Sequence, residues 1–192
     1  MDIKSSKGDK ALLVIDIQED ATGKTTNRPY KNSKELIDNV NLVINSSQTK
    51  GINVIYIKHE INGNFFNKIV MGNRFIKGTP GSEIDSRIRI INNHIFSKNK
   101  GNALSNPEVV NFLKKNNINK IFIVGLDASA CIYKTSLGAI EMGYEVLVLK
   151  DAIATSDMAK IPQILDKYKK KGILLTSIHE FEAISGVPIL RK

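Results

Sequence analysis

Short apolar runs alternate along this chain with segments whose apolar residues recur at helical spacing. The runs, typical of strands buried on both faces of a parallel sheet, occur at 11–17, 52–57, 94–98, 120–126, 145–149 and 172–178. Helical spacing occurs from Ser33, a candidate N-cap, to Gly51, and at 108–116, 129–142, 159–171 and 180–184. This alternation predicts an α/β fold, a three-layer α/β/α arrangement around a six-stranded, mainly parallel sheet with right-handed crossovers.

One long connection interrupts the alternation. Between residues 61 and 93 the periodicity weakens, and the turn-like sequence GTPG stands at 78–81. Connections of this length in a compact domain are usually functional. We therefore expect a single domain over residues 1–192, with a binding loop or lid at about 61–93.

Composition narrows the class of protein. Of the 192 residues 42% are hydrophobic and 24% charged, which is enough apolar material for a core. The single cysteine, Cys131, excludes a disulfide scaffold and a zinc site built from four thiolates of one chain. The beginning of the sequence has no apolar signal core, and no run of about 18 apolar residues occurs. We expect a cytoplasmic protein without a membrane segment.

The charge of +9 makes nucleic acid or another acidic partner worth weighing. The excess is scattered, and its densest cluster, 167–171, falls at the end of a predicted helix, where cations meet the negative end of the helix dipole. A solvated helix end is therefore the favoured interpretation, and we expect no nucleic-acid partner. A non-catalytic binding or interaction protein with a basic surface, on the same fold, remains the alternative.

Three reactive residues follow predicted strands at one edge of the sheet. Asp16 ends the first strand, Lys98 ends the third, and Cys131 lies in the first turn of the helix after the fourth. A helix N-terminus and a nearby Lys98 are expected to lower the pKa of the Cys131 thiol, with Asp16 as proton shuttle. Backbone N–H groups of 127–131 are expected to face an oxyanion. The arrangement predicts acyl transfer to water, although each residue alone is more often structural.

Three segments carry a resemblance to a known family. VIDIQ at 14–18, SKNKGNAL at 97–104 and GLDASACIYKTSLGAIEMGYEVLVLKDA at 125–152 resemble, in order and spacing, the isochorismatase-like cysteine hydrolases. The resemblance implies a parallel α/β sheet and an Asp, Lys and Cys triad that hydrolyses amides or related C–N bonds through a thioester, without a cofactor. The matching residues are Asp16, Lys98 and Cys131. It also implies a small-molecule substrate and a homodimer or larger homo-oligomer.

Two positions depart from the family pattern. Leu104 stands where the family has Phe, and Ala21 stands where an aromatic residue commonly follows the first motif. Both changes leave the triad in place and bear on the substrate pocket. The resemblance further implies a cis peptide bond near Leu126–Asp127, in an oxyanion turn formed by Leu126, Asp127 and Ala128.

The expected metal content is none. The nicotinamidase branch of the family carries Asp-x-His and a further His after the second strand, whereas this chain offers only Lys58-His59-Glu60 there. His59 is therefore expected to line or support the site. The other candidate pocket residues, each of which fits a core or subunit contact equally well, are Phe65, Phe66, Thr79 and Tyr133.

Overall fold

A six-stranded parallel sheet forms the centre of the molecule. The computed structural model describes residues 9–26, 29–64, 69 and 72–183. Neighbouring strands all pair in parallel, in the order β3-β2-β1-β4-β5-β6. This confirms the predicted α/β class. The strands are β1 (Lys10–Ile15), β2 (Asn53–His59), β3 (Ile95–Lys98), β4 (Lys120–Gly125), β5 (Glu145–Ile153) and β6 (Leu174–Thr176).

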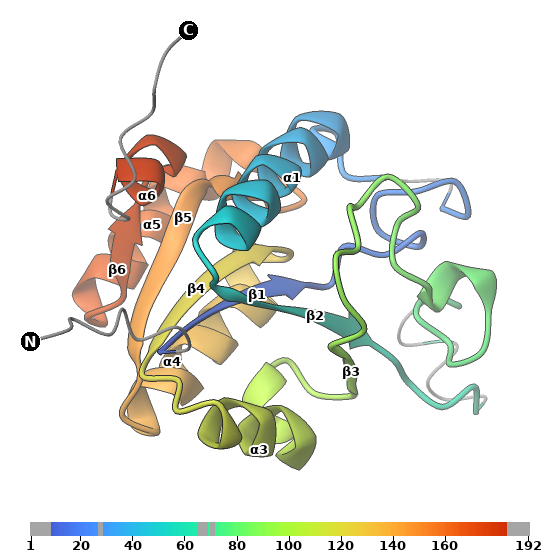
Figure 1. The fold of residues 1–192 in the computed structure, drawn as a ribbon. Helices are drawn as coiled ribbons and strands as arrows, with labels where there is room; N and C mark the ends of the chain where they lie inside the picture. The colour runs from blue at the N-terminus through green and yellow to red at the C-terminus, as the bar shows by residue number, and fades with distance from the viewer. Residues whose placement is uncertain (1–8, 27–28, 65–68, 70–71, 184–192) are drawn as a thin grey trace, which may run out of the picture.

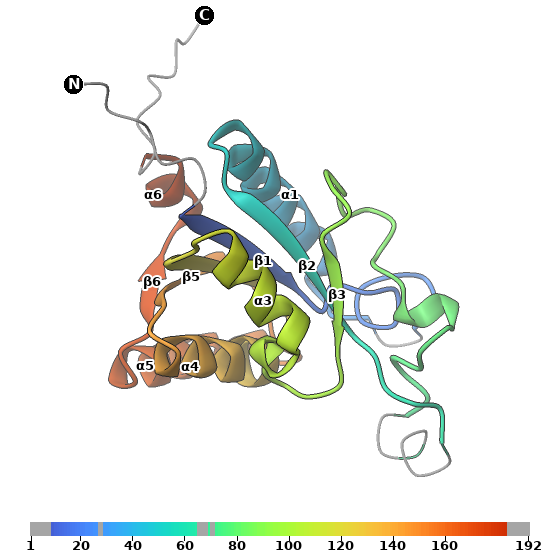
Figure 2. The ribbon, with the colours of Figure 1, turned by 60° about the horizontal axis from the view of Figure 1, so that its bottom comes forward.

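Helices cover both faces of the sheet (Figures 1 and 2). One face packs against α1 (Ser33–Thr49) and α6 (Ile178–Ala183). The other packs against α3 (Pro107–Lys115), α4 (Tyr133–Glu141) and α5 (Ile161–Lys170). Strand β1 is apolar throughout because both of its faces are buried. Leu12 and Val14 pack on the side of α1 and α6, and Leu13 and Ile15 pack on the side of α3, α4 and α5.

Several element boundaries differ from those expected from the sequence. Asn32, not Ser33, precedes the first helix as its N-cap, and its side chain makes no capping hydrogen bond. Strand β6 is shorter than the predicted 172–178 because the chain turns into α6 at Ile178, whose N–H donates to Asp151. The helix expected at 129–142 begins as a single wide turn over Ala128–Ile132 before α4.

The basic cluster near residue 170 lies where the sequence placed it. Lys167, Lys169 and Lys170 occupy the last turn of α5. In this position their ammonium groups meet the negative end of the helix dipole. Within the described parts of the chain, no helix is both long and apolar enough to cross a membrane.

The connection between β2 and β3 packs against the segment that follows β1. The two lie side by side beyond the carboxyl ends of the strands (Figure 1). Backbone hydrogen bonds join them: Glu19 N donates to Glu83 O at 3.0 Å and Asp20 N to Gly81 O at 2.9 Å. Between them, the carboxylate of Asp20 accepts from the N–H of Phe75 at 2.7 Å. These bonds give the long irregular connection a fixed place beside the sheet.

The sheet topology determines where a site can form. The chain leaves β1 toward α1 on one face of the sheet and leaves the adjacent strand β4 toward α4 on the other face. The two connections therefore diverge at this point of the sheet. In open parallel sheets, ligands bind at such a switch point beyond the carboxyl ends. Gly125, the last residue of β4, has φ +115°, and a Cβ there would lie 2.1 Å from the carbonyl oxygen of Ile15. Only glycine allows the two strand ends to approach so closely.

We predict that Gly125→Ala destabilises the protein by more than about 2 kcal/mol, because backbone strain at positive φ and a collision with β1 both act there. Gly143→Ala is the matched control, since Gly143 has φ +86° but nothing within 4 Å of an added Cβ. Urea unfolding of both variants measures the difference. Equal destabilisation by the two substitutions would contradict the close-approach explanation.

Candidate active site

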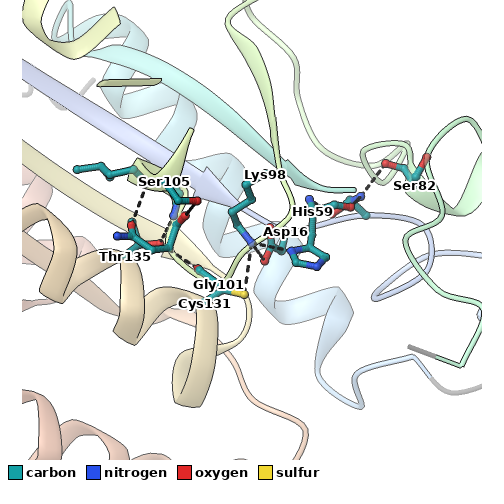
Figure 3. Close-up of polar contacts among 12 residues, drawn as sticks. Asp16, His59, Ser82, Lys98, Gly101, Ser105, Cys131 and Thr135 are labelled. Atoms are coloured by element: carbon teal, nitrogen blue, oxygen red, sulfur yellow. Dashed lines mark hydrogen bonds and ion pairs between the residues drawn. The ribbon is translucent and has the colours of Figure 1, made fainter. Parts of the chain in front are cut away.

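The ammonium group of Lys98 is the centre of a buried cluster at the carboxyl edge of the sheet (Figure 3). Its Nζ lies 2.7 Å from Asp16 Oδ2, 3.1 Å from His59 Nδ1 and 3.4 Å from Cys131 Sγ. The Lys98 side chain is 0% exposed and that of Asp16 is 8% exposed. The structure therefore brings together the three residues that the sequence proposed as catalytic and His59, which the sequence expected to line or support the site.

Strand register places three of these side chains. His59 and Lys98 are the last residues of β2 and β3, and they pair directly in the parallel ladder. Asp16 follows β1 with φ +56°, and its N–H donates to the carbonyl of Ile57 at 2.9 Å. This left-handed conformation is uncommon for a residue with a side chain, and it turns the chain away from the strand direction at the point where the carboxylate reaches Lys98.

Gln18 fixes the position of His59 from the adjacent segment. Its buried side-chain amide accepts from the N–H of His59 at 2.7 Å and donates to the carbonyl of the same residue at 3.0 Å. It also donates to Ser82 O at 2.7 Å. This amide thus ties the end of β2 to the long connection. Gln18 belongs to the segment VIDIQ at 14–18, but the sequence alone indicates no role for it.

Asp127 organises the turn that carries Cys131. One carboxylate oxygen accepts hydrogen bonds from Ser129 N at 2.7 Å, Ser129 Oγ at 2.5 Å and Thr155 Oγ1 at 3.1 Å. The other accepts from the Tyr30 hydroxyl at 3.0 Å and from Ser156 N at 3.3 Å. These five donors fix the start of the nucleophile turn. The peptide bond between Leu126 and Asp127 is cis, as the resemblance implies.

The N–H groups of this turn are more restricted than the sequence suggested. That of Ala128 donates to Ala154 O, that of Ser129 to the Asp127 carboxylate, and that of Ala130 to Asp127 O. The expectation that the whole turn faces an oxyanion, with Ala128 as part of the donor set, is therefore wrong. Of the five N–H groups from 127 to 131, we take those of Asp127 and Cys131 as the candidates for that role.

The thiol of Cys131 is less acidic than the sequence predicted. Burial, followed by the charge of Asp16, raises its pKa to about 12, and these effects outweigh the lowering by Lys98. The expected reduction of the pKa is wrong because burial disfavours the thiolate and, next in size, the nearby carboxylate of Asp16 opposes a second negative charge. At neutral pH Cys131 is a thiol.

His59 is neutral in this cluster. Burial and then the charge of Lys98 lower its pKa. Because an ammonium group only donates hydrogen bonds, Nδ1 of His59 must be the unprotonated nitrogen that accepts from Lys98. The second carboxylate oxygen of Asp16, Oδ1, is buried and accepts no hydrogen bond from the described residues. It is the basic atom left over once Lys98 has bound Oδ2.

The spacing between Cys131 and Thr135 within the 125–152 segment has a structural explanation. Thr135 Oγ1 accepts from Ala103 N at 3.0 Å and lies 3.5 Å from Gly101 O (Figure 3). One turn along α4, a Cβ on Gly138 would lie 2.1 Å from the Asn102 side chain. Helix α4 thus packs closely on the turn after Lys98, which holds the lysine at a fixed distance from the cysteine.

A small cavity opens beside the cluster. Its volume is about 120 Å³, and it is lined by Asp16, Ala21, Tyr30, His59, Phe75, Leu126, Asp127 and Cys131. The rings of His59 and Phe75 meet edge to face with centroids 5.7 Å apart. Sequence reasoning missed Tyr30 and Phe75, because both come from irregular segments in which no periodicity indicates which side chains turn inward.

The other predicted pocket residues lie elsewhere. Thr79 donates through its hydroxyl to Ile76 O and precedes a single 3₁₀ turn, Pro80–Ser82. Tyr133 stacks on Tyr168, with centroids 5.6 Å apart, under the ammonium group of Lys167. Neither Thr79 nor Tyr133 lines the cavity of about 120 Å³ described above. For Tyr133 the reason is that a helical position two residues from Cys131 faces another direction. Phe65 and Phe66 lie outside the described residues.

The cluster is a poor fit for a metal ion. Asp16, His59 and Cys131 each offer a ligand-type atom, and these atoms lie within 4.8 Å of one another. However, the ammonium group of Lys98 contacts all three, and Nδ1 of His59 is directed at that ammonium. A cation placed among these ligands would meet a buried positive charge at close range, which is strongly unfavourable. These residues therefore do not fit a metal ion while Lys98 lies among them.

Comparisons with known proteins identify relatives in sequence and in fold. A relative from Arabidopsis thaliana, named a probable inactive nicotinamidase, is 28% identical over 89% of this chain and 93% of its own length. A solved isochorismatase-like hydrolase from Alkaliphilus metalliredigens superposes with a TM-score of 0.81 at 17% identity, covering 93% of this chain and 98% of that one. An N-carbamoylsarcosine amidase from Thermoplasma acidophilum superposes with a TM-score of 0.75 at 22% identity, covering 88% and 96%.

The family assignment rests on a broader match. The sequence model of the isochorismatase domain matches residues 10–180, which span every strand of the sheet and all the residues of the cluster. The chain therefore belongs to the isochorismatase family.

Proposed function

We propose that this protein is a cofactor-independent hydrolase that cleaves the C–N bond of a small amide through a thioester on Cys131. The observation that carries the proposal is the position of one buried ammonium group, Lys98, within 3.4 Å of a carboxylate, a thiol and a neutral imidazole. An amide fits this site because Cys131 can attack the carbonyl carbon and Asp16 can give a proton to the leaving nitrogen, beside one small cavity. The name of the structurally similar amidase from Thermoplasma supports the same class.

The resting charge state suits a nucleophile that is activated only at the moment of attack. Asp16 and Lys98 form an ion pair, and Cys131 carries its proton because its pKa is about 12. Transfer of that proton to Asp16 Oδ1 generates the thiolate next to Lys98. The ammonium group then stabilises the new negative charge in place of the one lost from Asp16. This proton transfer from Cys131 to Asp16 leaves the net charge of the cluster unchanged.

The reaction proceeds in two balanced halves. As the Sγ–C bond forms, the carbonyl π electrons move to oxygen, and the N–H groups of Asp127 and Cys131 are the proposed donors to that oxyanion. When the intermediate collapses, the C–N bond breaks and Asp16 returns its proton to the leaving nitrogen. Water then attacks the thioester and gives a proton to Asp16. Cleavage of the C–S bond releases the carboxylic acid, and the proton on Asp16 passes to the departing sulfur, which restores both the Cys131 thiol and the Asp16 carboxylate.

His59 acts as a positioning residue in this scheme. Its Nδ1 accepts from Lys98, and its backbone is fixed by Gln18. The three acceptors around Lys98 Nζ therefore fix the direction of all three of its N–H bonds. The cavity of about 120 Å³ restricts the substrate to a compact molecule, far below the volume of drug-sized ligand sites.

We predict that Cys131→Ala abolishes hydrolysis, with a loss of at least about 10³-fold, because the covalent route requires the sulfur. Ammonia release from a panel of small amides, ureido compounds and acid amides provides the measurement. Lys134→Ala, on an exposed position of the same helix, is the control that should retain full activity. Turnover by Cys131→Ala at the wild-type rate would rule out the thioester.

We predict that Asp16→Asn makes Cys131 more reactive toward iodoacetamide while removing hydrolytic activity. In the wild type about 1 thiol in 10⁴ is ionised at pH 8, given a pKa of about 12. Removing the carboxylate charge leaves Lys98 as the dominant neighbour and lowers the pKa, so the labelling rate should rise at least tenfold. Mass spectrometry measures the labelling rate of Cys131 directly, because this is the only cysteine in the sequence.

Asp38→Asn is the matched control for charge, because Asp38 forms an exposed ion pair on α1 and should change neither labelling nor turnover. Circular dichroism verifies that each variant is folded. An Asp16→Asn protein that labels more slowly than the wild type would contradict the assigned electrostatics.

A further inference from the structure

Tyr168, on α5, contacts the turn that carries Cys131 but has no part in the proposed chemistry. The residue is fully buried in the core between the sheet and its helices. Its hydroxyl donates to the carbonyl of Ala128 at 2.5 Å, and its ring stacks on that of Tyr133 with centroids 5.6 Å apart. Ala128 comes before Cys131 in the chain and Tyr133 comes after it. Tyr168 therefore contacts the chain on both sides of the nucleophile.

The turn over Ala128–Ile132 is wider than a turn of α-helix. In an α-helix the N–H of Ile132 would donate to the carbonyl of Ala128. Here it donates to the carbonyl of Asp127 instead, one residue further back, at 3.1 Å. Wide turns of this kind are rare and occur mostly as single turns, often at functional sites. The carbonyl of Ala128 thus lacks its ordinary helical donor, and the Tyr168 hydroxyl takes that place.

Two different elements hold Ala128. Its N–H donates to the carbonyl of Ala154, just after β5, at 2.8 Å, while its own carbonyl accepts from Tyr168 on α5. Because Ala128 is fully buried, bulk water cannot replace the hydroxyl, and a buried carbonyl without a donor is costly. Burial, followed by the charge of Asp127, raises the pKa of the Tyr168 hydroxyl. The hydroxyl therefore keeps its proton and remains a donor at neutral pH.

We propose that Tyr168 is a positioning residue that keeps this turn in its wide form and thereby holds the sulfur of Cys131 beside Lys98. This inference rests on the proposed thioester mechanism, which needs the sulfur at its place 3.4 Å from the ammonium group. Without the hydroxyl, the carbonyl of Ala128 is free to accept from the N–H of Ile132, and the turn relaxes toward an α-helical turn. Cys131 lies between these two residues and moves with them. Small displacements of a nucleophile cost a large part of the rate.

The test compares two buried tyrosines whose hydroxyls hold different carbonyls. Tyr168→Phe removes one hydroxyl but keeps the ring and its stack on Tyr133. With the best substrate of the amide panel we expect kcat to fall at least about tenfold and KM to stay within about twofold, because no residue lining the cavity changes. 4-Aminophenylalanine in place of Tyr168 retains a donor at the same position and should restore most of kcat.

Tyr56→Phe is the matched control. Tyr56 is also buried, and its hydroxyl donates to the carbonyl of Arg89 at 2.8 Å, on the opposite face of the sheet from Tyr168. This variant also loses a buried hydrogen bond, but it should leave kcat and KM unchanged. Circular dichroism at the assay temperature verifies that each variant is folded, so that a lower kcat reflects the geometry of the site.

Hydrogen exchange separates this inference from the proposed function, because it needs no turnover. In Tyr168→Phe, amide exchange of peptides covering 127–133 should be at least about tenfold faster than in Tyr56→Phe, which corrects for a general loss of stability. Faster local exchange in a protein whose wild type hydrolyses no amide of the panel would support the hold of Tyr168 on the turn and overturn the thioester mechanism. Equal exchange in the two variants, or a wild-type kcat in Tyr168→Phe, would overturn the role of Tyr168 alone.

Discussion

The ion pair between Lys98 and Asp16 controls the properties of every other group in the cluster. A buried charge is tolerated only when it is paired and hydrogen-bonded, and the ammonium group of Lys98 meets this condition through Asp16, His59 and the Cys131 sulfur. Burial is the largest cause that keeps the proton on the thiol and the imidazole uncharged, and the pair adds to it, through Asp16 for the thiol and through Lys98 for the imidazole. The same contacts of Lys98 also set the positions of the three side chains around it.

The fold supplies the precision that this pair requires. Lys98 and His59 come from paired positions of adjacent strands, and Asp16 follows the next strand of the sheet. Cys131 comes from the opposite side of the switch point, where Gly125 allows β4 to approach β1 closely. Helix α4 packs through Thr135 and Gly138 onto the turn after Lys98. Distances within the cluster are thus fixed by strands and a helix, which are more rigid than loops.

The walls of the cavity have a different origin from its chemical groups. Tyr30 and Phe75 come from irregular segments that are held by polar contacts, among them those to Asp127 and Asp20 respectively. Irregular connections vary more readily than the sheet they flank, which lets one catalytic arrangement serve different substrates.

The sequence by itself determined the strands, the layers and the triad candidates, because buried parallel strands leave continuous apolar runs whose polar ends meet at one edge of the sheet. The tertiary structure decided what could not be read locally. Thr79 and Tyr133 proved to lie outside the cavity, since the direction of a side chain in a loop or wide turn depends on distant contacts. The direction of the Cys131 pKa shift is also opposite to the one predicted, because a pKa depends on burial and on charges, here those of Asp16 and Lys98, that come from distant parts of the chain.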